Sequence, residues 1–410
     1  MAVRQNGKNS WLNLNVALLG LISFFGDLSY ELITSLLPAF LATMGAGAAI
    51  LGMIEGISDG VSSFVKILSG YLSDRFRKRK EVAAVGYWLN CAFSVSVAFA
   101  TSPFMILIGR TVAWFGKGIR GPARDALLAA SVDKKDLGKA FGFHRAGDTA
   151  GAILGPLLGI LLIVSLTFQQ AFLIAIIPAV TAALLFTFFV KEKKENATVN
   201  QAAKPKTELS LSGIPPNYKT YLAAITVFGL ADFSHTLLVL RATQLLSPSM
   251  GIAGAAAAAA GLYAFRNVIY AGASYPLGAV SDKIGRKLLI GASYVLAVLV
   301  FIGFMFAGPE VVMLAVLFGL AGLYIAAEDT LESAAAADLL PDSLKATGFG
   351  LLGAANGIGD MVSSIVVGAL WAGVSPLAAF AYSAVVGSAG ALMMLFTKWE
   401  NRRGRVPTAI

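Results

Sequence analysis

The sequence predicts an all-α integral membrane protein whose transmembrane helices form two related six-helix bundles. The chain has 410 residues, of which 57% are hydrophobic and 13% are charged, whereas about a quarter of the residues in soluble domains are charged. It contains about twelve apolar runs, each close to or above the ~20 residues that a helix needs to cross a bilayer core. The second half of the chain repeats the charge and glycine pattern of the first half.

Each apolar run is expected to form one transmembrane helix. The runs are long and continuous, which excludes the ~10-residue alternation of a membrane β-barrel. The first run carries Asp27 and Glu31 and is too long for a signal peptide, so it is expected to remain as the first span. The single cysteine, Cys91, leaves no disulfide possible within one chain. In order, the runs cover 14–42, 48–73, 80–100, 103–130, 138–165, 168–190, 219–247, 254–281, 286–306, 310–338, 345–372 and 376–398.

The basic residues lie in alternate connections between the runs. Lys and Arg are absent from the turns near 43–47, 101–102, 166–170, 248–253, 307–309 and 373–375. They occur instead in both terminal tails, at 75–80, 117–139, 191–219 and 283–287, and at Lys345. By the positive-inside rule, both termini are cytoplasmic, and we expect a bacterial-type inner membrane. The net charge of +9 is thereby explained as a topology signal, so nucleic acid is not an expected partner.

One long polar stretch, 191–217, divides the chain. Its Lys-, Pro- and Ser-containing sequence is typical of a solvated linker. We therefore expect an N-terminal six-helix bundle at 1–190, a cytoplasmic linker at 191–217, a C-terminal six-helix bundle at 218–398 and a cytoplasmic tail at 399–410. At an offset of 208 residues, Gly70, Ser73, Asp74, Lys78 and Arg79 fall on Gly278, Ser281, Asp282, Arg286 and Lys287. Parallel repeats of this kind are a known transporter architecture.

Two repeated loops carry a family resemblance. GYLSDRFRKRK at 70–80 and GAVSDKIGRK at 278–287 resemble the signature G-x-L-x-D-R-x-G-R-[RK] of the major facilitator superfamily. The first loop has Arg77 where glycine is usual, and the second keeps Gly285. The resemblance covers nearly the whole chain and implies a twelve-helix transporter that works by alternating access.

In that family the loop motif acts as a cytoplasmic latch that stabilises the outward-open state. An acid at the end of one helix can meet the positive dipole at the N-terminus of another helix. The alternative is that the loops only set topology, which explains their bases but not their acids. The residues to which the resemblance assigns the latch are Gly70, Asp74, Arg75, Gly278, Asp282 and Arg286.

The fifth run resembles the antiporter motif of twelve-helix drug:proton exporters, G-x8-G-x3-G-P-x2-G-G. It contains Gly142, Gly151, Gly155, Pro156 and Gly159, and the final glycine of the motif is replaced by Ile160. Glycines at these spacings let two helices approach closely, and Pro156 bends the helix. The resemblance favours export over uptake; the alternative is ordinary packing of small residues.

Acids in the first two spans are candidates for proton coupling or substrate binding. Asp27 and Glu31 lie four residues apart, so they share one helix face, and their mutual repulsion favours proton binding by one of them. In related exporters, acids of the first span take part in coupling and in binding cations; the alternative is pairing with Arg110 or Arg145. Glu55 and Asp59 form a second such pair, which either lines the cavity or pairs with bases.

Basic residues of the fourth and fifth spans suggest further roles. Arg110 loosely resembles the arginine that related exporters use in proton relay, although the glycine that follows it is displaced to Gly116. His144 is interpreted as structural rather than as a proton switch. At the 208-residue offset, Arg120 and Arg124 correspond to Glu328 and Glu332. Opposite charges at pseudo-symmetric positions predict a gate that pairs in the outward-open state; the alternative is that each side chain reaches water independently.

The second half supplies further ionisable candidates. Asp232 and His235 are expected to share a face of the seventh span, with Arg266 on the eighth and Asp360 on the eleventh. The cavity would then have an acidic wall and a basic wall. A zwitterion or a carboxylate-bearing solute fits that arrangement as well as a lipophilic cation does.

The sequence therefore predicts a transporter, with proton-coupled export of a small organic molecule as the leading interpretation. The alternatives are an uptake symporter or facilitator for a sugar, organic acid or metal chelate, and a non-transporting sensor or assembly partner with this fold. No nucleophile elbow, phosphate loop or metal-ligand spacing indicates an enzyme. We expect no cofactor and no metal, a proton gradient as the energy source, membrane lipids and the solute as partners, and a monomer.

Overall fold

The computed structural model describes residues 11–76, 79–133, 136–192, 214–341 and 344–397, apart from the side chains of 67–76, 137–139, 282 and 345–347. These residues form twelve helices and no strand. The first six are α1 (Leu14–Thr43), α2 (Ala48–Phe76), α3 (Arg79–Ala98), α4 (Pro103–Ala129), α5 (Leu137–Ile163) and α6 (Phe168–Phe189). The others are α7 (Pro216–Gly229), α8 (Thr236–Ile284), α9 (Arg286–Met305), α10 (Val311–Leu339), α11 (Lys345–Gly373) and α12 (Pro376–Phe396).

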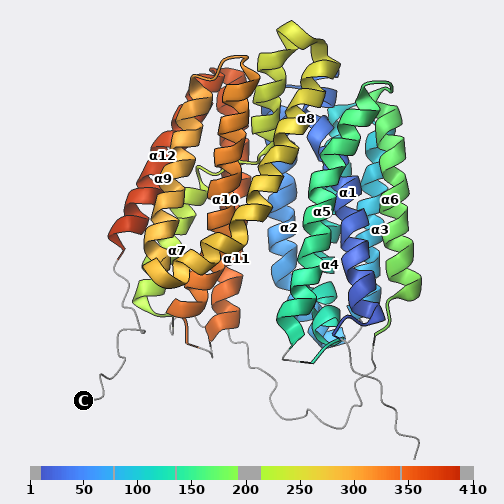
Figure 1. Cartoon of the computed structure of the whole chain (residues 1–410), viewed down its shortest axis with the longest axis vertical. Coiled ribbons are helices and arrows are strands. Elements are labelled where there is room, and N and C mark those ends of the chain that lie inside the picture. Colours follow the sequence, from blue (N-terminus) through green and yellow to red (C-terminus); the bar gives the residue numbers. More distant parts are fainter. Residues whose placement is uncertain (1–10, 77–78, 134–135, 193–213, 342–343, 398–410) are drawn as a thin grey trace, which may run out of the picture.

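The helices form two bundles that stand side by side, α1–α6 and α7–α12 (Figure 1). This confirms the predicted fold class. Ten of the helices in the described part of the chain are long and apolar enough to cross a membrane. The two exceptions have simple causes: α4 carries several charges, and α7 has only 14 residues.

The predicted seventh span at 219–247 is wrong in one respect, because it is broken. Helix α7 ends at Gly229, residues 230–235 are not helical, and α8 begins at Thr236. Helix α8 then contains two spans, since Gly251 has a φ of 69° and interrupts it. A positive φ is accessible to glycine at little cost, so the chain reverses there and the predicted eighth span at 254–281 follows.

The break in the seventh span is stabilised by side chains from distant helices. Ser363 of α11 donates to the carbonyl of Asp232 at 2.6 Å, and the amide of Ser234 donates to Ser364 Oγ at 3.0 Å. Tyr382 of α12 donates to the carbonyl of Leu230 at 3.0 Å. Backbone groups freed from a helix within a membrane need such partners, so the break is a defined part of the fold.

The two ends of the molecule differ. The end at which α6 ends and α7 begins lies at the bottom of Figure 1 and is called the linker end; the opposite end is the far end. Glycines let the bundles meet in the far-end half. An added Cβ at Gly52 of α2 would lie 2.2 Å from the carbonyl oxygen of Ser364, and one at Gly368 would lie 2.6 Å from that of Ala48.

Candidate functional site

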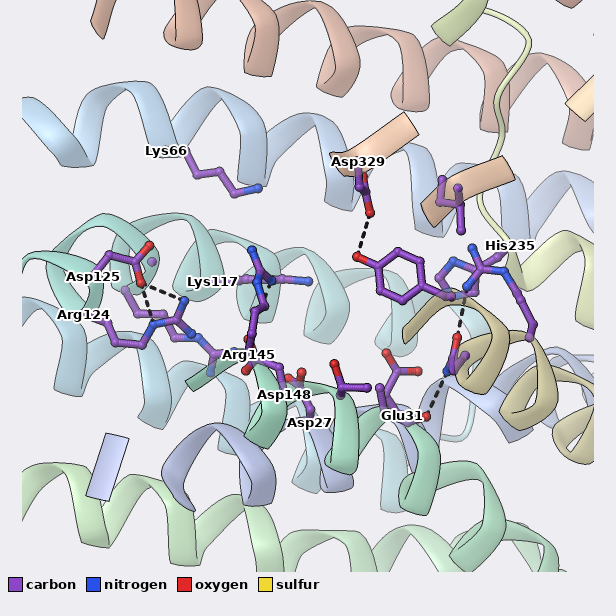
Figure 2. Close-up of a pocket in the computed structure, with 18 of the residues that line it drawn as sticks. Asp27, Glu31, Lys66, Lys117, Arg124, Asp125, Arg145, Asp148, His235 and Asp329 are labelled. Carbon is purple, nitrogen blue, oxygen red and sulfur yellow. Dashed lines mark hydrogen bonds and ion pairs between the residues drawn. The ribbon is translucent and has the colours of Figure 1, made fainter. Parts of the chain in front are cut away.

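A cavity of about 800 Å³ lies between the two bundles in their linker-end half. Helices α1, α2, α4 and α5 line one side, while α8, α10 and His235, next to the start of α8, line the other. The volume is typical of sites for small molecules, but the lining is unusually charged (Figure 2). Its carboxylates are Asp27, Glu31, Asp125, Asp148 and Asp329, and its bases are Lys66, Lys117, Arg120, Arg124, Arg145 and Arg266.

The acids of α1 face this cavity and pack against the glycines of α5. An added Cβ at Gly151 would lie 2.9 Å from Asp27 Cβ, and one at Gly155 would lie 2.9 Å from Glu31 Cβ. Gly159 continues this contact toward the far end, at 3.4 Å from Leu36. The predicted close approach is therefore confirmed along α1 and α5, with Pro156 inside α5. It does not extend to Gly142, where no described atom lies within 4 Å of an added Cβ.

Glu31 is part of a hydrogen-bonded chain that joins the two bundles. Tyr263 of α8 donates its hydroxyl proton to Glu31 Oε2 at 2.9 Å, and the same hydroxyl lies 2.9 Å from His235 Nε2. A tyrosine hydroxyl has a single proton, so His235 Nε2–H donates when Tyr263 donates to Glu31. The chain therefore offers a path along which a proton can be shared between the bundles.

The alternative prediction, that the α1 acids pair with bases, is wrong. Arg110 pairs with Glu55, and Arg145 pairs with Asp148 at 3.7 Å. Asp27 has no hydrogen bond or ion pair with another described residue and lies beside the cavity. It is thus available to a proton or to a solute.

Glu55 and Asp59 of α2 were expected either to line the cavity or to pair with bases. Neither acid lines the cavity, and Glu55 forms a buried ion pair. Glu55 Oε2 lies 2.7 Å from Arg110 Nη2, and both side chains are buried. Arg110 also donates to Tyr30 and lies 4.4 Å from the ring centroid of Trp114, whose indole donates to Asp59 at 2.5 Å. Glu55, Asp59 and Arg110 thus form a structural unit that joins α2 to α4.

Three bases at the cavity have no carboxylate partner among the described residues: Lys117, Arg120 and Arg266. Lys117 Nζ lies 4.7 Å from the ring centroid of Trp114, and Arg120 lies 4.6 Å from that of Tyr87. Arg266 donates to Asn267 at 3.1 Å, and its Nε has no hydrogen-bond partner in the described part of the chain. The predicted division into an acidic and a basic wall is wrong, because the N-terminal bundle supplies most charges of both signs.

No ion pair between described residues joins the predicted gate residues in this conformation. Arg124 pairs with Asp125 at 3.0 Å, whereas Glu332 accepts from Tyr294 at 2.5 Å within its own bundle. The gate was predicted for the outward-open state and stays a prediction. Asp232 and His235 do not share a helix face, because both lie in the non-helical break.

The loop motifs are partly described. Gly70, Asp74 and Arg75 lie in the last turns of α2, and their side chains, like that of Asp282, are outside the described set. Arg286 pairs with Asp338 of α10 at 2.5 Å, and an added Cβ at Gly278 would lie 3.4 Å from Thr330. The latch itself stays a prediction.

Sequence reasoning missed several cavity residues. Tyr263 connects Glu31 to His235, yet a tyrosine within an apolar run is equally consistent with core packing. Asp329 of α10 accepts from Tyr270 of α8 at 3.0 Å and faces the cavity (Figure 2). The one available signal is spacing, since Tyr263, Arg266 and Tyr270 recur at three and four residues along one helix face.

Comparison with known proteins agrees with this architecture. An uncharacterised MFS-type transporter of Methanocaldococcus jannaschii is 33% identical over 400 residues, covering 96% of this chain and 97% of that protein. A probable 4-methylmuconolactone transporter of Cupriavidus pinatubonensis is 26% identical, covering 81% of this chain and 78% of that protein. The crystal structure of the nucleoside transporter NupG aligns with a TM-score of 0.74 at 18% identity, covering 95% of this chain and 100% of that one.

The family model of the Major Facilitator Superfamily matches residues 19–265 and 222–409, which together span nearly the whole described chain. The relative at 33% identity and the solved structures that share this fold are transporters, which points to transport rather than to an enzyme. The chain therefore belongs to the Major Facilitator Superfamily, and it is a multi-pass membrane transporter.

Proposed function

We propose that this transporter couples proton movement to the export of a small organic molecule by alternating access. The observation that supports it most is the position of Asp27 and Glu31, which face the cavity one helix turn apart. A carboxylate that faces a substrate cavity can hold either a proton or a positively charged or hydrogen-bond-donating group of a solute. Competition between the two for the same oxygens is the physical basis of exchange.

The orientation follows from the bases. If the linker end is cytoplasmic, as the positive-inside rule predicts, then the cavity opens toward the cytoplasm and the far-end contacts close the opposite side. The conformation described here is then inward-open. Movement of one bundle against the other would open the far end and bring together the gate and latch residues at the linker end. We propose a monomer in an inner membrane, with no cofactor.

The α5 glycines support a direct connection between this movement and the acids. Gly151 and Gly155 allow the α1 backbone to rest against α5 at the level of Asp27 and Glu31. A change in the packing of α1 on α5 would therefore change the surroundings of both carboxylates. This is consistent with the antiporter-type motif in the sequence.

The test is proton movement in everted membrane vesicles that contain the full chain. A pH-sensitive dye reports the gradient while lipophilic cations, siderophores, amino acids and sugar acids are added in turn. We expect one class to dissipate the gradient, and the response to be lost in the Asp27→Asn, Glu31→Gln variant. Asp133→Asn, at an exposed site near the linker end, is the matched control. Accumulation of a panel member in right-side-out vesicles, with no dye response to any class, would contradict export.

A second candidate is proton-coupled uptake of an organic acid. Lys117, Arg120 and Arg266 reach the cavity from both bundles without a carboxylate partner in the described set, and a clamp of this kind suits an anionic solute. The relative whose name gives 4-methylmuconolactone as its solute is consistent with a small organic substrate. This candidate predicts that Lys117→Met and Arg266→Met abolish accumulation of sugar acids in right-side-out vesicles.

A further inference from the structure

Four carboxylates gather inside the C-terminal bundle, outside the cavity lining described above. They are Asp232 in the break between α7 and α8, Glu328 and Glu332 on α10, and Asp360 on α11. Asp232 and Glu328 are each 8% exposed, and Glu332 is 2% exposed. We call these four residues the C-bundle acids.

The C-bundle acids lie close enough for Asp232, Glu332 and Asp360 to act electrostatically on Glu328, and hydrogen bonds from their helix neighbours fix this arrangement. Tyr324, one turn before Glu328 on α10, donates to Asp232 Oδ1 at 3.0 Å. Asn356, one turn before Asp360 on α11, donates to Glu332 Oε2 at 2.9 Å. Residues four apart on a helix share a face, so α10 and α11 direct Glu328 and Asp360 toward the same interior region as Asp232.

The C-bundle acids lack a basic counterpart in the described part of the chain. None of them forms an ion pair with another described residue. The positive charge of Arg266 on α8 attracts Asp232, and that of Lys66 on α2 attracts Asp360. Both attractions act over distances longer than an ion pair. Asp329 on α10 and Asp59 on α2 add further negative charge nearby. The tyrosines that surround the site donate hydrogen bonds but carry no positive charge; they are Tyr221, Tyr294 and Tyr324. An uncompensated buried charge costs several kcal/mol, so ionising the three buried acids together, next to half-buried Asp360, would be strongly unfavourable.

The donors are distributed unequally. Asp232 accepts a hydrogen bond from Tyr324, and Glu332 accepts one from Tyr294 and one from Asn356. These donors stabilise the two carboxylates. Glu328 Oε2, by contrast, is buried without a hydrogen-bond partner among the residues that the structure describes. A carboxylate oxygen in such a place is the position at which a positive charge is most needed.

We propose that Glu328 binds a proton in this conformation, so that the C-terminal bundle holds a second proton site, separate from Asp27 and Glu31. The proton comes from water and bonds to the unpartnered carboxylate of Glu328, leaving the neutral acid. Approach of Arg120 or Arg124 in the gated state would stabilise the ionised form and release the proton to water.

The site can be tested without knowing the solute. Infrared difference spectroscopy on the purified full chain in lipid follows the carbonyl band of protonated carboxyl groups as pH is raised. Above pH ~6 an exposed glutamate is already ionised, so the remaining band comes from buried acids. We expect Glu328→Gln to remove one carboxyl from this band, and Glu310→Gln, at the exposed N-terminus of α10, to leave it unchanged. A full band in Glu328→Gln would overturn the proposal.

Two further arms keep the result interpretable. If Glu328→Gln fails to fold, Glu328→Asp is measured instead, because it keeps a carboxyl group at this position. The carbonyl band of that carboxyl must then shift in frequency. An unshifted carbonyl band would refute the assignment to Glu328. Repeating the titration in sodium and in choline salts tests the ion, since loss of the band in sodium alone would replace the proton by sodium. The Asp27→Asn, Glu31→Gln variant must keep the Glu328 contribution, which separates failure of this site from failure of proton-coupled export.

Discussion

Tyr263→Phe should shift the balance between the two conformations of the transporter. The hydroxyl of Tyr263 is the group that connects Glu31 of the N-terminal bundle to His235 of the C-terminal bundle. The substitution removes the hydroxyl and leaves the ring, which stacks on His235 at a centroid distance of 4.9 Å. The contact joins residues of different bundles, so movement of one bundle against the other changes it directly.

The size of the effect follows from the kind of hydrogen bond. A bond to a charged group contributes about 1.5–3 kcal/mol, which corresponds to a factor of roughly 10 to 150 in an equilibrium constant. If the bond exists only in the conformation described here, its loss reduces the ratio of that conformation to the other by this factor. Some of the lost energy returns through water in the cavity, so we expect the lower end, about tenfold.

The assay is a distance distribution between spin labels at the linker end. Cysteines introduced as Asp133→Cys and Lys283→Cys lie at exposed positions, one on each bundle, and buried Cys91 is replaced by Ser. We expect the long-distance population to fall in Tyr263→Phe. Tyr270→Phe is the matched control, because it removes a hydroxyl from the same helix and the same cavity, but its bond to Asp329 lies within one bundle. Equal populations in Tyr263→Phe and wild type would refute the reasoning.

Two further predictions concern stability. Glu55→Gln should destabilise the protein by about 3–5 kcal/mol, since it leaves the buried Arg110 without its counter-ion; a thermal melt in detergent checks this, and Glu55→Gln with Arg110→Met should recover part of the loss. Gly155→Val should cost about 1–3 kcal/mol by overpacking α1 against α5, whereas Gly142→Val, where the space is open, should melt like wild type. A melt of Gly155→Val as high as that of Gly142→Val would contradict the packing argument.

The helices could be predicted because each apolar run, together with the charges of its flanking connections, indicates a membrane span without reference to the other runs. The break at 230–235 could not, since it depends on Ser363, Ser364 and Tyr382, which lie more than a hundred residues away in the sequence. Asp and Ser within the break favour local backbone bonds over a helix, yet such residues also occur within intact spans. The predicted shared face of Asp232 and His235 was wrong for this reason.

The candidate site was predicted in part. Asp27, Glu31 and Arg266 were singled out because ionisable residues in a span are costly without a function or a partner. Which of the two applies depends on contacts between helices, so Glu55 and Arg110 could be recognised as a pair only when α2 and α4 were placed together. The sequence locates buried charges, whereas the fold decides which of them are neutralised.

The mixture of charges in the cavity makes the sign of coupling depend on the solute. A cationic group competes with protons for Asp27 and Glu31, so its binding expels protons, and exchange follows. An anionic group is attracted by Lys117 and Arg266 but repelled by the same carboxylates, so protons on Asp27 and Glu31 assist its binding, and co-transport follows. Linkage is reciprocal, so the change in solute affinity with pH gives the direction of coupling. Affinity that rises with pH supports antiport of a cation, and affinity that falls with pH supports symport of an acid.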